Sequence, residues 1–209
     1  MKKIFILGSG GFAKEVYSLI HAIGGYVVEG FIDLSAREPV QLGPVSLPVF
    51  AESYLEELTE KPALAIGVGD PKLIQKLVSK FGADHEFPNL LHPTVIGHFD
   101  DITFERGNIV TASCIFTISI KVGSFNIFNL NTTIGHDVVI GDCNVINPMV
   151  NISGGVTIGS GNLLGVNSTI LQYKTIGNGS VIGASSLVTK DVEDSVLVLG
   201  VPAVKLKSL

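Results

Sequence analysis

One histidine of the chain stands beside a carboxylate in a setting suited to proton transfer. His136 and Asp137 are adjacent in the segment Ile134-Gly-His-Asp-Val-Val-Ile-Gly-Asp142. Histidine titrates near neutral pH and is the usual general base in enzymes, and a neighbouring carboxylate can hold its ring in one tautomer. The alternative is a histidine in a surface turn with no chemical role. The residue types therefore offer His136 as a candidate base and Asp137 as the group that orients it.

A glycine-rich turn near the start of the chain is a second candidate site. Gly8-x-Gly10-x-x-Ala13 has the form of a nucleotide-binding fingerprint, and backbone amides at a helix N-terminus attract anions. Asp33 follows at a predicted strand end, where an acid can accept hydrogen bonds from a ribose or a base. The alternative is a tight strand-to-helix turn without a ligand. The order of strand, turn, helix and acid favours a bound nucleotide, and a domain of this size is too short for a full dinucleotide fold.

The first 90 residues contain the elements that would position this turn. Apolar runs predict strands, glycine and proline mark the turns, and Asp70 before Pro71 predicts a capped helix start. The alternation of strands and helices predicts a small parallel sheet of the doubly wound, Rossmann-like type over residues 1–90. The predicted strands are 2–7, 27–33 and 63–68, and the predicted helices are 14–23 and one that begins at 71.

A repeat of six residues dominates the rest of the chain. Every sixth residue from Phe104 to Val188 is apolar, without one insertion. This period fits neither an α-helix nor a two-residue strand alternation, and it predicts a β-helix over residues 91–209. Each short strand would place one branched residue inward, before a turn that tolerates Gly or Asn, and three sixes would form one triangular coil. His92, where the chain enters the coils, is interpreted as structural.

The composition limits the classes of function. The net charge is −5 and there is no long basic run, so a nucleic-acid-binding protein is not expected. No apolar stretch is long enough for membrane insertion. Cys114 and Cys143 have neither a disulfide framework nor metal-ligand spacing, which predicts a reducing, cytoplasmic location and no metal site. Residues 104–188 carry only six charged side chains, so we expect identical neighbours to cover much of their surface.

The whole chain resembles the bacterial sugar acetyltransferases of the hexapeptide-repeat acyltransferase superfamily. That branch includes N-acetyltransferases of UDP-4-amino sugars and of GDP-perosamine, and proteins described as sialic acid O-acetyltransferases. The resemblance implies a left-handed parallel β-helix, a homotrimer with active sites between protomers, and a role in surface polysaccharide or glycan biosynthesis. It rests on Gly8 to Ala13, Phe31-Ile-Asp33, Ala65-Ile-Gly67, Gly135-His-Asp137, Ser153-Gly-Gly155 and Gly200-Val-Pro-Ala203.

The resemblance also implies roles for individual residues. His136 would deprotonate the acceptor as it attacks acetyl-CoA, Asp137 would orient the imidazole, and the amide of Gly154 would donate to the oxyanion. No metal is needed, because the thioester is already activated. The implied acetyl-CoA contacts are Gly154, Gly155, Val166, Ala184, Lys190 and Lys205, and those to the nucleotide sugar are Gly10, Gly11, Phe12, Asp33 and Gly67.

Two departures and two alternatives belong with this prediction. Many relatives have histidine where this chain has Phe12, and some have it where Val145 stands. The first change affects the expected nucleotide contacts, and the second removes one expected cofactor contact. The main alternative is O-acetylation of a sialic acid or another sugar, which the same His–Asp pair could serve. The other is a non-catalytic, trimeric ligand-binding scaffold.

Overall fold

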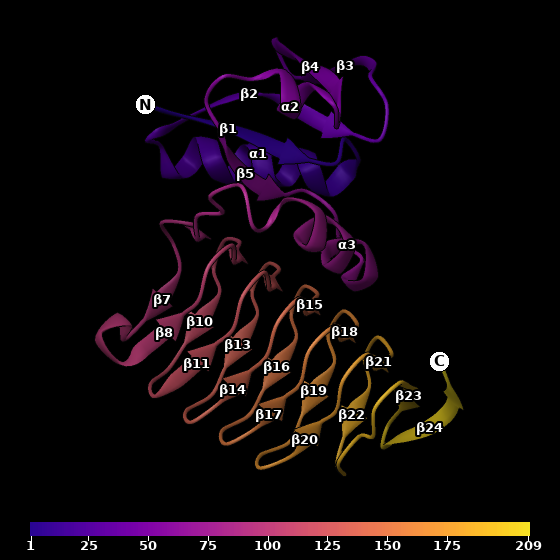
Figure 1. Ribbon diagram of the computed structural model, residues 1–209. Coiled ribbons are helices and arrows are strands. Elements are labelled where there is room, and N and C mark those ends of the chain that lie inside the picture. Colours follow the sequence, from indigo (N-terminus) through magenta and orange to yellow (C-terminus); the bar gives the residue numbers. More distant parts are fainter.

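The computed structural model describes residues 1–209 and shows a small α/β domain seated on a long β-helix (Figure 1). The α/β domain contains a five-stranded sheet in the order β3-β4-β2-β1-β5. Strands β1, β2, β4 and β5 are parallel, as the sequence predicted for the first, second and last of them. Its elements are β1 (Lys2–Leu7), α1 (Gly11–Ile23), β2 (Tyr26–Asp33), β3 (Arg37–Leu42), β4 (Val45–Ala51), α2 (Tyr54–Glu57), β5 (Ala63–Ile66) and α3 (Pro71–Phe81).

The hairpin of β3 and β4 and the short helix α2 were not predicted. Strand β3 is antiparallel to β4 and lies at the edge of the sheet, so the sheet is mixed rather than wholly parallel. Both strands contain a proline. Proline has no backbone N–H to donate to the hydrogen bonds between strands, so its presence argues against a strand when only the sequence is known. Pro48 is tolerated because the pairing of β4 with β2 begins one residue later, at Val49.

The β-helix consists of short parallel strands that recur in three sheets. Partners in neighbouring coils are 18 residues apart, as for Ile115 with Thr133 and Thr133 with Asn151, and the coils are left-handed. Its strands are β6 (Leu90–Leu91), β7 (Ile96–Gly97), β8 (Ile102–Phe104), β9 (Ile109–Val110), β10 (Ile115–Phe116), β11 (Ile120–Val122), β12 (Ile127–Phe128), β13 (Thr133–Ile134), β14 (Val139–Ile140), β15 (Val145–Ile146), β16 (Asn151–Ile152), β17 (Thr157–Ile158), β18 (Leu163–Leu164), β19 (Thr169–Ile170), β20 (Thr175–Ile176), β21 (Val181–Ile182), β22 (Leu187–Val188), β23 (Val196–Gly200) and β24 (Ala203–Ser208).

The predicted row of every sixth residue forms the interior of the β-helix. All its members from Val110 to Val188 are buried, and Phe104, in the outermost coils, is partly buried. A second, polar row runs beside it: the buried amides of Asn108, Asn126 and Asn144 bond to one another from coil to coil. Each amide also donates to a backbone carbonyl of the adjacent turn, as Asn126 does to Gly141 at 2.8 Å. The interior is therefore apolar on its strands and hydrogen-bonded along one corner.

The turn geometry differs from the expectation in one respect. The left-handed backbone conformation falls on the third residue after the inward residues, for example Asn131, Asp137 and Cys143, and glycine stands there only at residues 107, 155, 161 and 179. The glycines directly after the inward residues have another role. A β-carbon on Gly123 would lie 2.8 Å from the carbonyl oxygen of Gly141 in the next coil. These glycines allow coils to approach closely, and they do not supply the left-handed turn.

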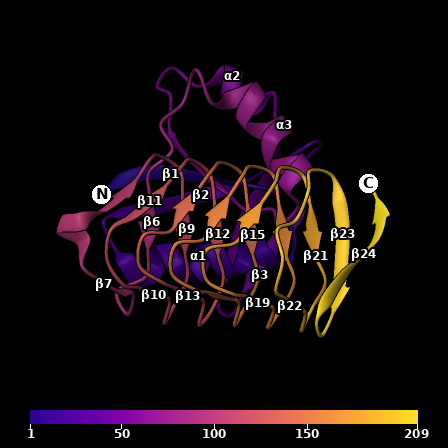
Figure 2. The same cartoon turned by 90° about the horizontal axis from the view of Figure 1, so that it is seen from below.

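The α/β domain and the β-helix share one apolar core. The outward residues Ile109, Ile127 and Val145 of β9, β12 and β15 are buried against the α/β domain. Helix α1 runs along the coils in both cartoon views, and the β23–β24 hairpin closes the far end (Figure 2). Val145 thus belongs to the interface between domains. No helix of the structure has the length and apolarity required to cross a membrane.

Candidate active site

His136 and Asp137 lie in the turn between β13 and β14 and are hydrogen-bonded to each other. His136 Nδ1 is 2.7 Å from Asp137 Oδ2. A carboxylate accepts hydrogen bonds, so Nδ1 carries the proton and Nε2 is left with a free lone pair. Both side chains are more than half exposed in the single chain. The turn therefore presents an oriented, solvent-accessible imidazole whose Nε2 can accept a proton.

The imidazole packs on Gly154, the equivalent residue of the next coil. A β-carbon at residue 154 would lie 2.5 Å from His136 Cε1, so only glycine admits the ring in this position. The N–H of Gly154 has no hydrogen-bond partner, whereas that of Gly155 donates to the carbonyl of His136 at 2.7 Å. A free backbone donor beside a base is an arrangement that can stabilise a developing oxyanion.

Two further residues complete this arrangement and were not assigned a role from the sequence. A β-carbon at Gly135 would lie 2.5 Å from the nitrogen of Gly154, so glycine at 135 keeps that N–H uncovered. The ring of Tyr173 lies against Gly155 and is 69% exposed. Tyr173 is 18 residues after Gly155, and this spacing is the signal from which its position could have been inferred.

The turns of the β-helix form three ridges along its length. The turns after β10, β13, β16, β19 and β22 form the histidine ridge, and those after β9, β12, β15, β18 and β21 form the apolar ridge. The polar ridge consists of the turns after β11, β14, β17 and β20. The histidine ridge carries His136, Gly154, Gly155, Tyr173 and Lys190, and the apolar ridge carries Ala112, Leu130, Met149, Val166 and Ala184. Within one chain the predicted cofactor contacts Val166 and Ala184 are thus a full sheet away from His136.

The glycine turn lies at the start of α1, which begins at Gly11 rather than at the predicted Lys14. Gly10 is the N-cap residue and has no side chain to bond the first N–H groups, so the backbone donors of Gly11 and Phe12 are free for an anion. Asp33 lies beside the turn and accepts hydrogen bonds from Ser9 and, at 2.8 Å, from the backbone N–H of Leu34. These residues form one continuous candidate nucleotide site.

Gly67 contributes to this site through close packing. It is buried, and a β-carbon there would lie 2.5 Å from Cγ2 of Ile6 and 3.0 Å from the β-carbon of Ala13. The absence of a side chain lets the end of β5 approach both β1 and α1. Gly67 thereby fixes the shape of the turn from behind.

The histidine ridge is remote from the α/β domain of the same chain. That domain covers the sheet that contains β9, β12 and β15, whereas β13 and β14 belong to the other two sheets. In a triangular cross-section, the edge between two faces lies opposite the third face (Figure 1). The structure thus does not bring the glycine turn and His136 of one chain together.

The two cysteines are not suited to act as catalytic nucleophiles. Burial raises the pKa of the thiols of Cys114 and Cys143 to about 11. A thiol is reactive as the thiolate, so both groups are inert at neutral pH. His136 remains the side chain suited to proton transfer on the surface of the β-helix.

Comparison with known proteins identifies structures that are similar over the whole chain. Residues 3–81 match the family described as the PglD N-terminal domain. A search of curated sequences gave no significant match. A mutant of perosamine N-acetyltransferase from Caulobacter crescentus, in complex with CoA and GDP-perosamine, superimposes with a TM-score of 0.91 at 27% identity, over 100% of this chain and 98% of that one. The chain is similar over its whole length to sugar acetyltransferases of the hexapeptide-repeat family.

Two other acetyltransferase-like structures are similar over almost the whole chain. The acetyltransferase domain of PglB from Neisseria gonorrhoeae, in complex with acetyl coenzyme A, has a TM-score of 0.88 at 25% identity and covers 98% of this chain and 99% of its own. WeeI from Acinetobacter baumannii has a TM-score of 0.84 at 25% identity, with coverages of 99% and 100%. Both domains of this acyltransferase therefore have counterparts in these proteins.

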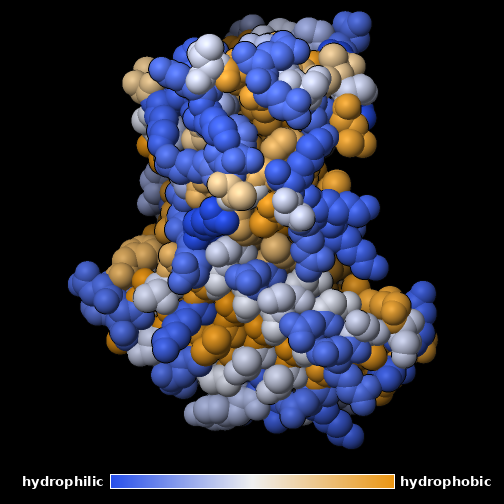
Figure 3. All heavy atoms as spheres, viewed as in Figure 1, coloured by the Kyte–Doolittle hydropathy of each residue, from blue (hydrophilic) through white to orange (hydrophobic).

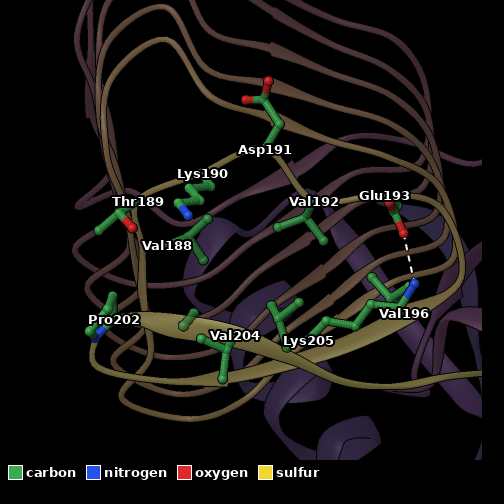
Figure 4. Close-up of a pocket in the computed structure, with 12 residues that line it drawn as sticks. Val188, Thr189, Lys190, Asp191, Val192, Glu193, Val196, Pro202, Val204 and Lys205 are labelled. Atoms are coloured by element: carbon green, nitrogen blue, oxygen red, sulfur yellow. Dashed lines mark hydrogen bonds and ion pairs between the residues drawn. The ribbon is translucent and has the colours of Figure 1, made fainter.

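Lys190 and Lys205, two predicted cofactor contacts of this acyltransferase, line one pocket at the end of the β-helix (Figure 4). The pocket has a volume of about 320 Å³ and lies between the last coil and the β23–β24 hairpin. Lys205 is paired with Glu193 at 2.7 Å, and both side chains are at least half exposed. An exposed pair of this kind is weak, so a phosphate could displace Glu193.

Proposed function

We propose that the protein transfers the acetyl group of acetyl-CoA to an amino group of a nucleotide-linked sugar, with His136 as general base. One observation carries the proposal: the free Nε2 of an oriented imidazole lies against Gly154, whose N–H is unpaired. Relatives crystallised with CoA and GDP-perosamine, or with acetyl-CoA, support the choice of donor and acceptor.

The proposed chemistry needs only these groups. His136 Nε2 takes a proton from the acceptor amine as its nitrogen attacks the thioester carbonyl, and Asp137 stabilises the imidazolium. The Gly154 N–H donates to the negatively charged oxygen of the tetrahedral intermediate. Collapse breaks the carbon–sulfur bond, and the CoA thiolate leaves and receives the proton. The N-acetyl sugar and free CoA are the products.

We further propose that the active protein is a homotrimer, on the evidence of one face of the β-helix. The face between the histidine ridge and the apolar ridge has no charged outward residue on its strands, and Ile96 and Ile115 are exposed there. Both ridges that bound this face also expose apolar side chains, including Ile118, Leu130 and Val166. White and orange atoms reach the surface over the middle of the β-helix (Figure 3). Exposed apolar side chains gathered on one face are typical of protein–protein interfaces, which supports this face as the contact between protomers.

The polar ridge supports the same choice of face. Its exposed side chains bond along the ridge: the N–H of Ser124 donates to Asp142, that of Asp142 to Ser160, and that of Ser160 to Asn178. Such a ridge is stable in water and has no need of a partner. Three apolar faces that meet around a threefold axis leave the three polar ridges outside.

This arrangement brings the separated halves of the site together. Around the axis, the histidine ridge of one protomer meets the apolar ridge of the next, which carries Val166 and Ala184. The apolar ridge also borders the sheet beneath the α/β domain. The nucleotide held at Gly10, Gly11, Phe12 and Asp33 of one protomer would thus serve the His136 of its neighbour. Both cysteines are free and buried, and we propose a reducing, cytoplasmic location.

The experiment that tests the catalytic proposal is His136→Ala, assayed with acetyl-CoA and amino-sugar nucleotides. We expect kcat to fall by about 10²- to 10⁴-fold, the range typical of a lost general base. The melting temperature and the oligomeric state should not change, because the side chain is exposed. His98→Ala is a matched control, since His98 is also exposed and lies in the first coil of the β-helix. Unchanged turnover in His136→Ala would disprove the mechanism.

The acceptor class is tested by thermal shift with UDP-, GDP-, dTDP- and CMP-sugars, each with and without acetyl-CoA. A ligand that binds only the native state raises the melting temperature. We expect a shift from acetyl-CoA and from one nucleotide series. A shift from acetyl-CoA alone would indicate a free sugar as acceptor, and no shift from any ligand would favour the non-catalytic scaffold. In the alternative, O-acetylation, the same His–Asp pair would deprotonate a hydroxyl group of the sugar in place of the amine.

A further inference from the structure

A pocket lies between α1 and the first coils of the β-helix. None of the predicted site residues lines it. It has a volume of about 210 Å³, below the 300–1,000 Å³ typical of sites for drug-sized ligands. Its polar residues are Glu15, Ser18, His92 and Thr111, and its apolar wall includes Leu19 and Leu130. We call this cavity the α1 pocket.

The polar groups of the α1 pocket are available for a ligand. Glu15 and Ser18 are exposed, and their side chains make no hydrogen bond or ion pair in the structure. They follow the glycine turn on the same helix: α1 rises about 6 Å from Gly11 to Glu15 and about 10 Å to Ser18. A group attached to a phosphate at the glycine turn can therefore reach both side chains.

The hydrogen bonds of His92 fix which of its nitrogens faces a ligand. Its Nδ1 accepts from the backbone N–H of Thr94 at 3.2 Å and lies 2.8 Å from the Thr94 hydroxyl. Because Nδ1 accepts from the Thr94 N–H, it carries no proton, and the Thr94 hydroxyl, which itself accepts from the N–H of Ser113, is the donor to Nδ1. In neutral His92 the remaining proton is on Nε2, which has no partner. His92 is thus a donor here, beside the acceptor Glu15.

We propose that the α1 pocket binds the sugar ring of the nucleotide-linked acceptor and that Glu15 makes it selective for neutral or amino sugars over acidic ones. The inference rests on the proposed function and adds the residues that read the sugar. A pyranose has hydroxyl groups around its rim and apolar C–H faces. Glu15, Ser18 and His92 supply acceptors and donors for the hydroxyl groups, and Leu19 and Leu130 supply an apolar surface for a face of the ring.

The negative charge of Glu15 in the pocket disfavours an acidic sugar. Glu15 has no cationic partner, and the neighbouring Lys14 does not line the pocket. A sugar carboxylate placed beside an unpaired glutamate would be repelled, which is an established way to reject a competing ligand. A sialic acid is therefore excluded as acceptor, whereas a neutral hexose or an amino sugar is accepted.

The position of the pocket suits transfer between protomers. Thr111 and Leu130 belong to the apolar ridge, which in the proposed trimer faces the partner's His136. A sugar in the pocket would turn its free side toward that imidazole. Glu15 and Ser18 are therefore specificity-determining residues that the nucleotide-binding protomer contributes.

The test is Glu15→Gln, with Lys14→Gln as the matched control on the same helix turn. Binding of GDP-perosamine and of a UDP-linked 4-amino sugar is measured by titration calorimetry, and that of GDP and UDP alone alongside. For whichever sugar nucleotide wild-type protein acetylates, we expect Glu15→Gln to weaken binding by about ten- to one hundredfold, the range for one lost charged hydrogen bond. Binding of the bare nucleotide, the KM for acetyl-CoA and the melting temperature should stay as in wild type.

A second arm uses CMP-linked sialic acid. We expect wild-type protein to bind it no better than CMP, and Glu15→Gln to gain affinity for it. If Glu15→Gln binds the acetylated sugar nucleotide within twofold of wild type, the inference is wrong although the proposed function stands. If wild-type protein acetylates the sialic acid and neither amino sugar, both are wrong.

Discussion

The contact between His136 and Gly154 depends on the missing side chain at residue 154. The imidazole occupies the space that a β-carbon would fill, and the same residue offers the unpaired N–H. One glycine thus sets the position of the base and supplies the proposed oxyanion donor. A substitution at residue 154 should lower activity by moving the His136 ring, since it changes neither the base nor its carboxylate partner.

We predict that Gly154→Ala lowers kcat by about 10²-fold, because a displacement of the order of 1 Å in a catalytic group has effects of this size. The new methyl group forces the His136 ring off the glycine while its bond to Asp137 can persist. The control is Gln172→Ala, at the equivalent turn position one coil further. Steady-state kinetics and a melting curve check the prediction. Full activity in Gly154→Ala would show that the ring does not act from this position.

The repeat groups some of the predicted site residues and leaves others apart. His136 and Gly154 are 18 residues apart, at equivalent positions of successive coils, and Asp137 is adjacent to His136, so the repeat alone places them together. Val166 and Ala184 were expected in a groove between two adjacent β-helices, and their position within the repeat puts them on the apolar ridge, a full sheet away from His136 of the same chain. A six-residue period shows which residues point inward, and it contains no information on which edges of two separate prisms meet.

At the scale of elements, the Asn108–Asn126–Asn144 row is a buried hydrogen-bonded column inside an apolar core. Asn126 Oδ1 accepts from both the backbone N–H and the side-chain amide of Asn144, each at 2.9 Å. Every amide in the column has both a donor and an acceptor partner, which is the condition for a stable buried network. The 18-residue spacing of the asparagines is visible in the sequence and could have predicted the column.

We predict that Asn126→Ala destabilises the protein by about 3 kcal/mol, because it leaves the backbone N–H of Asn144 and the carbonyl of Gly141 without partners. For a chain of this size the melting temperature should fall by about 6 to 12 °C. Asn178→Ala is the control: its amide oxygen also accepts from the neighbouring coil, but at the exposed surface. Thermal unfolding of both variants gives the comparison. Equal losses would mean that the column contributes no more than a surface hydrogen bond.

The α/β elements show where sequence patterns lose information. Strands β1, β2 and β5 and the Asp70-capped helix α3 follow from apolar runs and turn residues, and Asp70 does accept from the N–H of Leu73. The β3–β4 hairpin does not, because Pro39 and Pro48 interrupt a pattern that is already half exposed. An edge hairpin is stabilised by its pairing with the rest of the sheet, here with β2. The sequence of the hairpin itself does not show this pairing.

At the scale of the molecule, the two candidate sites of one chain lie on opposite sides of the β-helix. The α/β domain covers one sheet, and His136 projects from the edge formed by the other two. In a single chain, the candidate nucleotide site therefore has no base near it, and His136 has no bound acceptor within reach. The uncharged face between the histidine and apolar ridges offers a surface through which a second copy can supply the missing half.

Mixed trimers test this division directly. His136→Ala removes the proposed base and Asp33→Ala weakens the candidate nucleotide site, so we predict that each variant on its own is nearly inactive. When the two variants are unfolded together and refolded as a mixture, a site is intact wherever an unaltered nucleotide domain meets an unaltered His136 of its neighbour. Random assembly gives about a quarter of such sites, so about a quarter of wild-type activity should return. Acetyl transfer before and after co-refolding measures this recovery, and the same variants refolded separately and then mixed serve as the control. If the site lay within one chain, every chain of the mixture would carry a defect and no activity would return.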